Sequence, residues 1–187
     1  MTRPSRHIEP RSSLEYARHY IRELVYGAND GVITTFAVVA GVAGGGISAV
    51  AVLIVGSANL LADGLSMAVG NYLSIRSNES ALLAQGLPEE EAQPVRHAVA
   101  TFLAFVVAGA VPLLPYVVPI SVRNPFAVSI ALTFVVLFGI GALRASVTAD
   151  RPLASGLETL GLGVVVAVVA YGAGAAVASL AGTGTAP

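Results

Sequence analysis

The chain contains no cysteine, no tryptophan and no lysine, and only 11% of its residues are charged. The absence of cysteine excludes disulfides, thiolate metal sites and thiol redox chemistry, so a bound metal must use oxygen, imidazole or thioether ligands. A soluble domain carries about 25% charged residues, whereas 55% of this chain is hydrophobic. This much apolar surface predicts an integral membrane protein with the lipid bilayer as a partner.

The charge that is present has no strong sign, because the formal net charge is −1. Nucleic-acid binding requires a concentrated basic face, and here the arginines are spread along the chain. We therefore expect no nucleic-acid partner. Ile8 to Glu23 alternates charged and apolar residues, a pattern that does not fit a cleavable signal peptide.

The predicted fold class is all-α, an integral membrane bundle of five transmembrane helices with an N-terminal amphipathic helix. Residues 1–13 are predicted to be a disordered cytosolic tail, residues 14–180 the five-span domain and residues 181–187 a short tail. Each apolar segment meets the requirement of about 20 residues for crossing a bilayer. The expected spans are 26–45, 48–75, 98–118, 125–145 and 157–180.

The amphipathic helix is expected from Leu14 to Val25, where apolar residues at helical spacing alternate with charged ones. Nearly all arginines fall on one side of a five-span arrangement, and only Arg123 falls on the other. By the positive-inside rule the N-terminus is cytosolic and the C-terminus is outside.

Acidic residues within the spans are the strongest sign of function. A charged side chain at the centre of a membrane helix costs at least about 2.5–3.5 kcal/mol on insertion scales, and such residues usually mark ion pathways or proton relays. Asp63 lies near the middle of the second expected span and Asp30 lies within the first. Asn59, Met67 and Asn71 share one helical face with Asp63, at steps of four residues.

This stripe offers one carboxylate, two amide oxygens and one thioether, a donor set that suits Mn²⁺ and Fe²⁺ better than Mg²⁺ or Ca²⁺. Helix packing is the alternative, because Asn side chains and small residues also join membrane helices. Asp30 has its own alternative as an N-cap of the first span.

Further carboxylates are weaker candidates for metal ligands. Glu158 stands at the start of the fifth span, where capping is the alternative. The others lie in the expected cytosolic loop 76–97, where a solvated acidic face is the alternative: Glu79, Glu89, Glu90 and Glu91. His97 stands alone at the start of the third span, and His19 falls in the amphipathic segment, so neither is selected as a ligand.

Two motifs resemble the first two spans of the vacuolar iron transporter family. They begin at Tyr26-Gly-Ala-Asn-Asp30-Gly and at Ala62-Asp-Gly-Leu-Ser-Met67. Gly141-Ala-Leu-Arg144 and Ser155-Gly-Leu-Glu158 resemble the fourth and fifth spans. The resemblance implies a five-helix homodimer that exchanges cytosolic Fe²⁺ or Mn²⁺ for protons, with Asp30 and Met67 at the positions of the family's aspartate and methionine.

The chain departs from the family pattern at two ligand positions and in one segment. Asn59 and Asn71 stand where many members carry glutamate, and the long glutamate-rich cytosolic helices between spans two and three are cut to a short loop. Asp63, one turn from Asn59, can restore the missing carboxylate.

We therefore expect a non-enzymatic, cofactor-free exporter of divalent metal working by proton antiport. Composition places it in a bacterial plasma membrane. The alternatives are a membrane scaffold that transports nothing and an exporter of another small cation.

Overall fold

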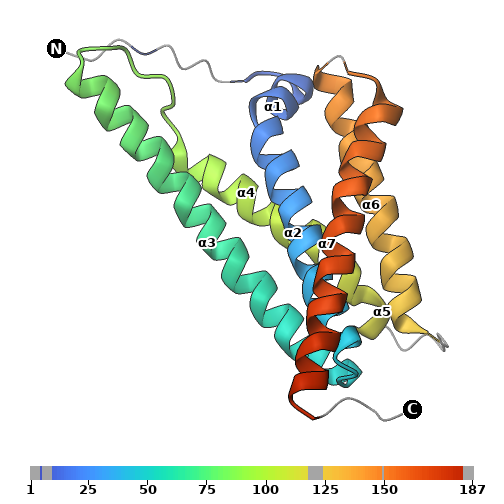
Figure 1. Cartoon of the computed structure of the whole chain (residues 1–187). Coiled ribbons are helices and arrows are strands. Elements are labelled where there is room, and N and C mark those ends of the chain that lie inside the picture. The colour runs from blue at the N-terminus through green and yellow to red at the C-terminus, as the bar shows by residue number, and fades with distance from the viewer. Residues whose placement is uncertain (1–4, 6–9, 118–123, 149, 183–187) are drawn as a thin grey trace.

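The computed structural model describes Ser5 and residues 10–117, 124–148 and 150–182, and the helices form a single bundle (Figure 1). Five of them are long and apolar enough to cross a membrane: Ile21–Gly44, Ala49–Ala84, Pro94–Val117, Pro125–Ala145 and Pro152–Leu180. The predicted all-α, five-span fold class is thus confirmed. Three predicted segments lie largely outside the described residues. They are the tail 1–13, the turn after the third span, at 118–123, and the tail 181–187.

The predicted amphipathic helix over 14–25 forms only in part. Helix α1 covers Ser13–His19, and helix α2 (Ile21–Gly44) begins after a break at Tyr20, whose φ of −99° and ψ of 9° are not helical. Ser12 caps α1 by accepting a hydrogen bond from the Glu15 backbone N–H, as in a capping box. The second half of the predicted segment therefore belongs to the first span.

The second span is longer than expected. Helix α3 runs from Ala49 to Ala84, nine residues beyond the predicted end at 75, and stops at Gln85 and Gly86. Gly86 has φ of +71°, a left-handed conformation that glycine adopts at low cost after a helix. The predicted 76–97 loop is thereby reduced to residues 85–93, which hold no described helix.

The third span is built from three pieces, α4 (Pro94–Gly109), a 3₁₀ turn η1 (Val111–Leu113) and α5 (Leu114–Val117). Helices α6 (Pro125–Thr148) and α7 (Pro152–Leu180) follow as an antiparallel pair. Helix α1, the 85–93 loop and the link between α6 and α7 lie at one end of the bundle, which we call the α1 end (Figure 1). The α2–α3 turn and the end of α7 lie at the opposite end.

Helix α2 is the centre of the bundle and packs on α4, α7, α6 and α3. Phe36 and Val39 of α2 meet Phe105 of α4 and Leu60 of α3 in the apolar core. Buried apolar surface stabilises little inside a membrane, where lipid is equally apolar, so close packing of small residues matters more. Gly27 and Gly31 provide it against α4, and Gly44 provides it against α7.

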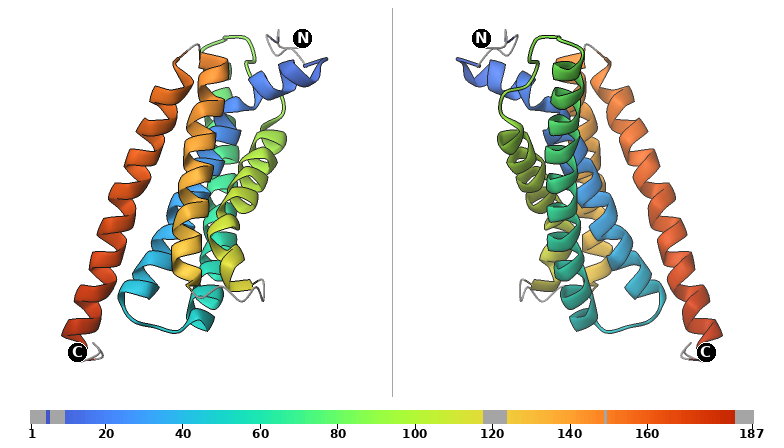
Figure 2. Two further views of the ribbon diagram at one scale, coloured as in Figure 1. Left: turned by 90° about the vertical axis from the view of Figure 1, so that its right-hand side faces the viewer. Right: turned by 90° about the vertical axis from the view of Figure 1, so that its left-hand side faces the viewer.

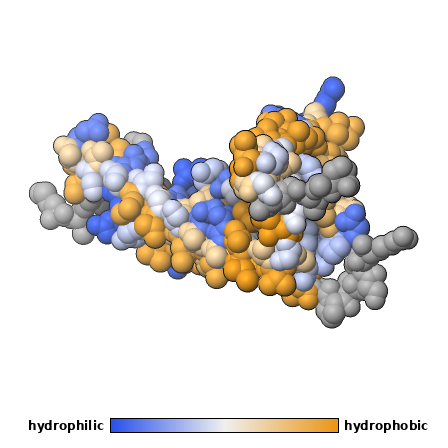
Figure 3. Space-filling view, turned by 60° about the horizontal axis from the view of Figure 1, so that its bottom comes forward, coloured by the Kyte–Doolittle hydropathy of each residue, from blue (hydrophilic) through white to orange (hydrophobic). Residues whose placement is uncertain are grey.

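The outer helices carry the surface that faces lipid. Only 6% of the most apolar 18-residue stretch of α7 is buried inside the bundle, and α7 lies along the outside of the bundle (Figure 2). In Figure 3 hydrophobic residues cover much of the lower edge and of the right part of the face shown, while hydrophilic residues lie near its middle and at its left end. Exposed apolar surface of this kind suits contact with lipid.

Candidate functional site

The two aspartates within the spans come from neighbouring helices. Asp30 of α2 and Asp63 of α3 are both half-buried, and the two helices pack against each other. The antiparallel hairpin places the two aspartates at the same depth, because Asp30 lies 14 residues before the end of α2 at Gly44 and Asp63 lies 14 residues after the start of α3 at Ala49. At 1.5 Å per residue, both are about 21 Å from the turn.

Asp30 is not an N-cap, which corrects one alternative from the sequence. Helix α2 begins at Ile21 with Tyr20 as its N-cap, so Asp30 sits more than two turns inside the helix. Its backbone carbonyl accepts a hydrogen bond from Thr34 Oγ1 at 2.8 Å. A capping role for the side chain is thereby removed.

The stripe of Asn59, Asp63, Met67 and Asn71 is present as one face of α3, and its members differ in their contacts. Asn59 donates a hydrogen bond to Asp63 Oδ2 at 2.8 Å. Asn71 donates one to Thr101 Oγ1 on α4 at 2.9 Å, which is the helix-joining role named as the alternative. Met67 packs against the edge of the apolar core.

A cavity of about 490 Å³ lies beside this stripe, towards the α1 end. It is lined by Met67 and Asn71 of α3 and by Arg22, Glu23 and Tyr26 of α2, among others. The thioether and an amide thus share one space with the carboxylate of Glu23. A second cavity, of about 670 Å³, also has Arg22 and Glu23 in its wall and opens at the α1 end.

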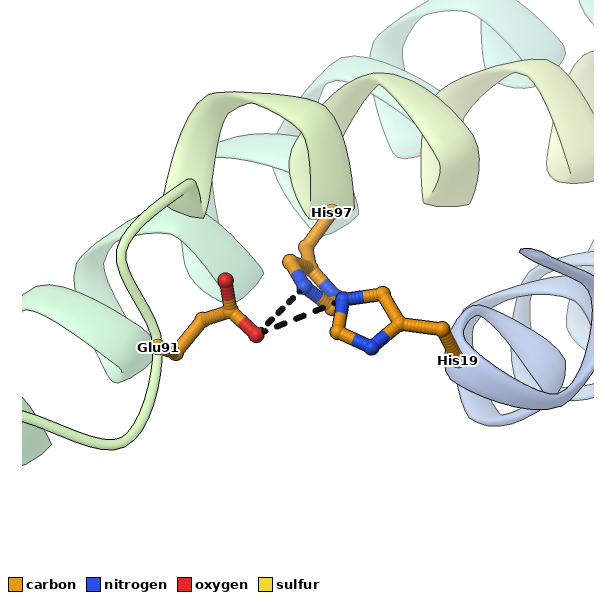
Figure 4. Close-up of side chains that lie close together, drawn as sticks. All are labelled: His19, Glu91 and His97. Carbon is orange, nitrogen blue, oxygen red and sulfur yellow. Dashed lines mark ion pairs between the residues drawn. The ribbon is translucent and has the colours of Figure 1, made fainter. Parts of the chain in front are cut away.

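The wall of the second cavity holds a cluster of imidazoles and carboxylates (Figure 4). His97 Nε2 lies 2.9 Å from Glu91 Oε2, and His19 Nε2 lies 3.5 Å from the same oxygen. These three residues, which we call the His–Glu cluster, each offer one ligand atom within 4.8 Å of the others. They come from three separate elements: α1, the 85–93 loop and the first turn of α4.

Glu23 completes the surroundings of the cluster. Its Oε1 lies 3.2 Å from His97 Nδ1 and accepts a hydrogen bond from Arg22 at 2.8 Å. The Glu23 side chain is 2% exposed and that of His97 is 6% exposed. Among the described residues, Glu23 Oε2 has no hydrogen-bond partner. A buried carboxylate oxygen without a partner is costly and calls for a cation or a water molecule.

The four glutamates predicted to lie in the 76–97 loop differ in their contacts. Glu79 Oε1 accepts hydrogen bonds from the backbone N–H groups of Glu90 and Glu91, at 3.0 and 2.8 Å. Glu90 lines the larger cavity, and Glu91 belongs to the His–Glu cluster. Glu89 forms an isolated bridge with Ser5. Of these four, Glu91 lies against a histidine, with its Oε2 2.9 Å from His97 Nε2.

Glu158 forms its contacts with residues of α6 and lines a different cavity, together with Arg22, Tyr26 and Asn29 of α2. Its Oε2 accepts a hydrogen bond from Arg144 at 2.8 Å, and Arg144 also donates to Ser155 Oγ at 3.1 Å. These contacts join α6 to α7. Glu158 is the seventh residue of α7, so the expected capping geometry does not apply.

Sequence reasoning missed His19 and Glu23 and set His97 aside as a lone interfacial histidine. No spacing rule connects residues 19, 23, 91 and 97, because they meet only when α4 packs beside α2. The sequence did offer one signal, the position of these residues relative to the predicted spans. His19 and Glu23 are one turn apart just before the first span, and Glu91 and His97 lie just before the third span. The five-span topology puts both pairs at one end.

The helices and these side chains define a multi-pass membrane protein with an acidic pair inside its spans and a histidine–carboxylate cluster at one end. A profile of the VIT family matches residues 21–87 and 78–175, and the chain belongs to that family.

Similar proteins have been described in plants. The chain is 26% identical to vacuolar iron transporter 2 of Oryza sativa subsp. japonica, over 88% of this chain and 90% of that protein. It is 36% identical to vacuolar iron transporter homolog 5 of the same species, over 68% of this chain and 65% of that protein. It is also 24% identical to vacuolar iron transporter 1 of Arabidopsis thaliana, over 83% of this chain and 85% of that protein. The resemblance found in the sequence is thus confirmed.

Proposed function

We propose that this protein transports a divalent transition metal, Fe²⁺ or Mn²⁺, out of the cytosol in exchange for protons. The observation that carries the proposal is that two aspartates, Asp30 and Asp63, lie at the same depth on neighbouring apolar spans. Two negative charges at that depth repel each other unless a cation or protons neutralise them. The names of the relatives, vacuolar iron transporters, support iron as a substrate.

The proposed path starts at the α1 end, which we assign to the cytosol. Glu23 stands in the walls of both cavities, so an ion leaving the larger one meets Met67 and Asn71 in the smaller one. Asp30 and Asp63 then lie about one turn deeper. Weak, mixed ligands suit this task, because an ion held too tightly would not leave.

Proton antiport follows from the same carboxylates. Carboxylates bind metal in their ionised form, so a proton arriving from the far side competes with the ion and favours its release. This exchange needs no nucleotide and no cofactor. It is a transport mechanism, and no covalent step is assigned to the protein.

We further propose that the protein works as a homodimer in a bacterial plasma membrane. Support comes from an exposed apolar row on α3, formed by Leu61, Leu65, Val69 and Leu73, which a second copy of the chain would cover. A two-fold dimer would double each ligand of the proposed path. The ion would then be held by ligands from both subunits.

The test is metal flux into proteoliposomes that contain a fluorescent metal indicator. We expect Asp63→Asn to reduce Fe²⁺ and Mn²⁺ flux, and the coupled proton flux, by at least about 10–100-fold. Mutation of the hydrogen-bond partners of metal ligands already lowers metal affinity or activity by this factor. Asp150→Asn is the matched control, since Asp150 lies outside the spans in the α6–α7 link. Equal flux in wild type and Asp63→Asn would remove Asp63 from the path.

The same assay separates the alternatives. A scaffold that transports nothing would give no flux in wild type, and Asp63→Asn would then change only subunit association. A carrier of other cations would show no competition when Fe²⁺, Mn²⁺, Co²⁺ and Zn²⁺ are added together.

A further inference from the structure

We propose that the His–Glu cluster of His19, Glu91 and His97 binds a divalent transition-metal ion at the α1 end, in the wall of the larger cavity. The cluster lies outside the helix stripe described above. That the cluster supplies metal ions to the transport path depends on the proposed function, whereas metal binding by the cluster does not.

The distances within the cluster fit a metal coordination sphere. Metal bonds of about 2.0–2.1 Å in a tetrahedral site place neighbouring ligand atoms about 3.3 Å apart. The two observed contacts to Glu91 Oε2, 2.9 and 3.5 Å, bracket this separation. The third separation, between the histidines, is within 4.8 Å, so a small side-chain movement closes the sphere.

Glu23 prepares His97 as a ligand. A metal-bound histidine usually uses its second ring nitrogen to donate a hydrogen bond to a carboxylate, which fixes the ring and its tautomer. Glu23 Oε1 lies 3.2 Å from His97 Nδ1, leaving Nε2 directed at Glu91. Arg22 in turn binds Glu23 through two nitrogens, at 2.8 and 3.1 Å. This carboxylate–histidine chain is the pattern expected behind a metal ligand.

The surroundings leave room for the ion and for its exchange. Three protein ligands leave at least one coordination position open to water, and the cluster faces a cavity of about 670 Å³. Glu23 Oε2, buried and without a hydrogen-bond partner among the described residues, lines the same cavity and can accept a hydrogen bond from such a water. An open position also lets the ion move on.

The donor atoms define which ions fit. Two imidazoles and one carboxylate suit Fe²⁺, Co²⁺ and Zn²⁺, whereas Mg²⁺ and Ca²⁺ prefer sites built wholly from oxygen. The cluster is therefore expected to bind transition metals in the presence of excess Mg²⁺. It supplies a selective site in a chain whose 85–93 loop is too short to hold a helical metal-binding domain.

The test is Co²⁺ titration of the purified full-length protein in detergent, followed by the visible absorption of the bound ion. We expect imidazole-coordinated Co²⁺ in wild type, and an affinity lowered by at least about 10-fold in His19→Gln and in Glu91→Gln. Both side chains are partly exposed, at 22% and 18%, so these variants should still fold. Glu15→Gln, which removes a carboxylate from the same short helix, should bind as wild type does.

Two comparisons make the outcome decisive. Wild-type affinity in both His19→Gln and Glu91→Gln, or Co²⁺ without imidazole ligands, would overturn the cluster as a metal site. Asp63→Asn should lose flux yet keep the imidazole-coordinated Co²⁺. Histidine-dependent Co²⁺ binding in a protein without metal flux would support the cluster as a metal site and refute transport. Metal flux together with histidine-independent Co²⁺ binding would support transport and refute the cluster as a metal site.

Discussion

At the scale of single residues, Glu79 shows how a carboxylate can serve a metal site without touching the ion. It projects from α3, and its Oε1 accepts hydrogen bonds from two backbone N–H groups of the 85–93 loop, those of Glu90 and Glu91. The loop holds no helix of its own, and these two contacts attach its backbone at Glu90 and Glu91 to α3. Glu79 is therefore a positioning residue for the His–Glu cluster.

This role gives a prediction that separates positioning from ligation. Glu79→Ala removes the acceptor and should weaken Co²⁺ binding by about 10-fold, as loss of an outer hydrogen bond does at other metal sites. Glu79→Gln keeps an oxygen that can accept the same bonds and should restore most of the affinity. Equal losses in the two variants, measured by the same Co²⁺ titration, would mean that Glu79 is itself a ligand.

At the scale of helices, the glycines of α2 determine how closely α4 approaches. A Cβ added at Gly27 would lie 2.7 Å from the Thr101 carbonyl oxygen, and one at Gly31 would collide with the backbone of Phe105. Backbone atoms cannot move aside as a flexible side chain can. Gly27 and Gly31, which are four residues apart, therefore serve packing within one chain.

Gly31→Ala is expected to destabilise the protein by about 1–3 kcal/mol, the usual result of overpacking. Because α4 carries His97, the variant should also weaken metal binding at the His–Glu cluster. Gly161→Ala is the control, since a Cβ there meets nothing within 4 Å. Thermal unfolding in detergent measures the stability of both variants. An unchanged unfolding midpoint for Gly31→Ala would contradict the close α2–α4 contact.

At the scale of the whole molecule, the arrangement of the five spans determines sidedness. The described arginines at positions 11, 18, 22, 76, 96, 144 and 151 belong to elements that meet at the α1 end. By the positive-inside rule we predict that this end faces the cytosol. The end of α7 is then predicted to lie outside, since an odd number of spans separates it from α1.

The cysteine-free sequence allows a direct test of this orientation. Ile47→Cys lies in the α2–α3 turn and Asn78→Cys lies near the end of α3 at the α1 end, and both residues are exposed. In intact cells a membrane-impermeant maleimide should label Ile47→Cys and spare Asn78→Cys, with the wild type as a blank. The opposite labelling would reverse the orientation, and equal labelling would contradict the odd number of spans between the two ends.

The sequence by itself determined the membrane class, the five spans and the two intramembrane aspartates. Apolar runs of sufficient length have few alternatives in a bilayer, because every backbone group must be hydrogen-bonded within its helix. That Asp30 and Asp63 lie at one depth was not predicted, since it depends on where α2 ends and α3 begins. The first-span helix boundary was less predictable, since one non-helical residue, Tyr20, divides the amphipathic segment.

Only the tertiary structure brought His19, Glu23, Glu91 and His97 together. The cluster needs α4 to pack on the glycines of α2, the break at Tyr20 to turn α1 across the bundle end, and Glu79 to hold the loop. Each condition concerns the relative placement of separate elements, which periodicity within one helix does not encode. Local patterns determine helices and their depth, whereas side chains from three elements converge only through packing.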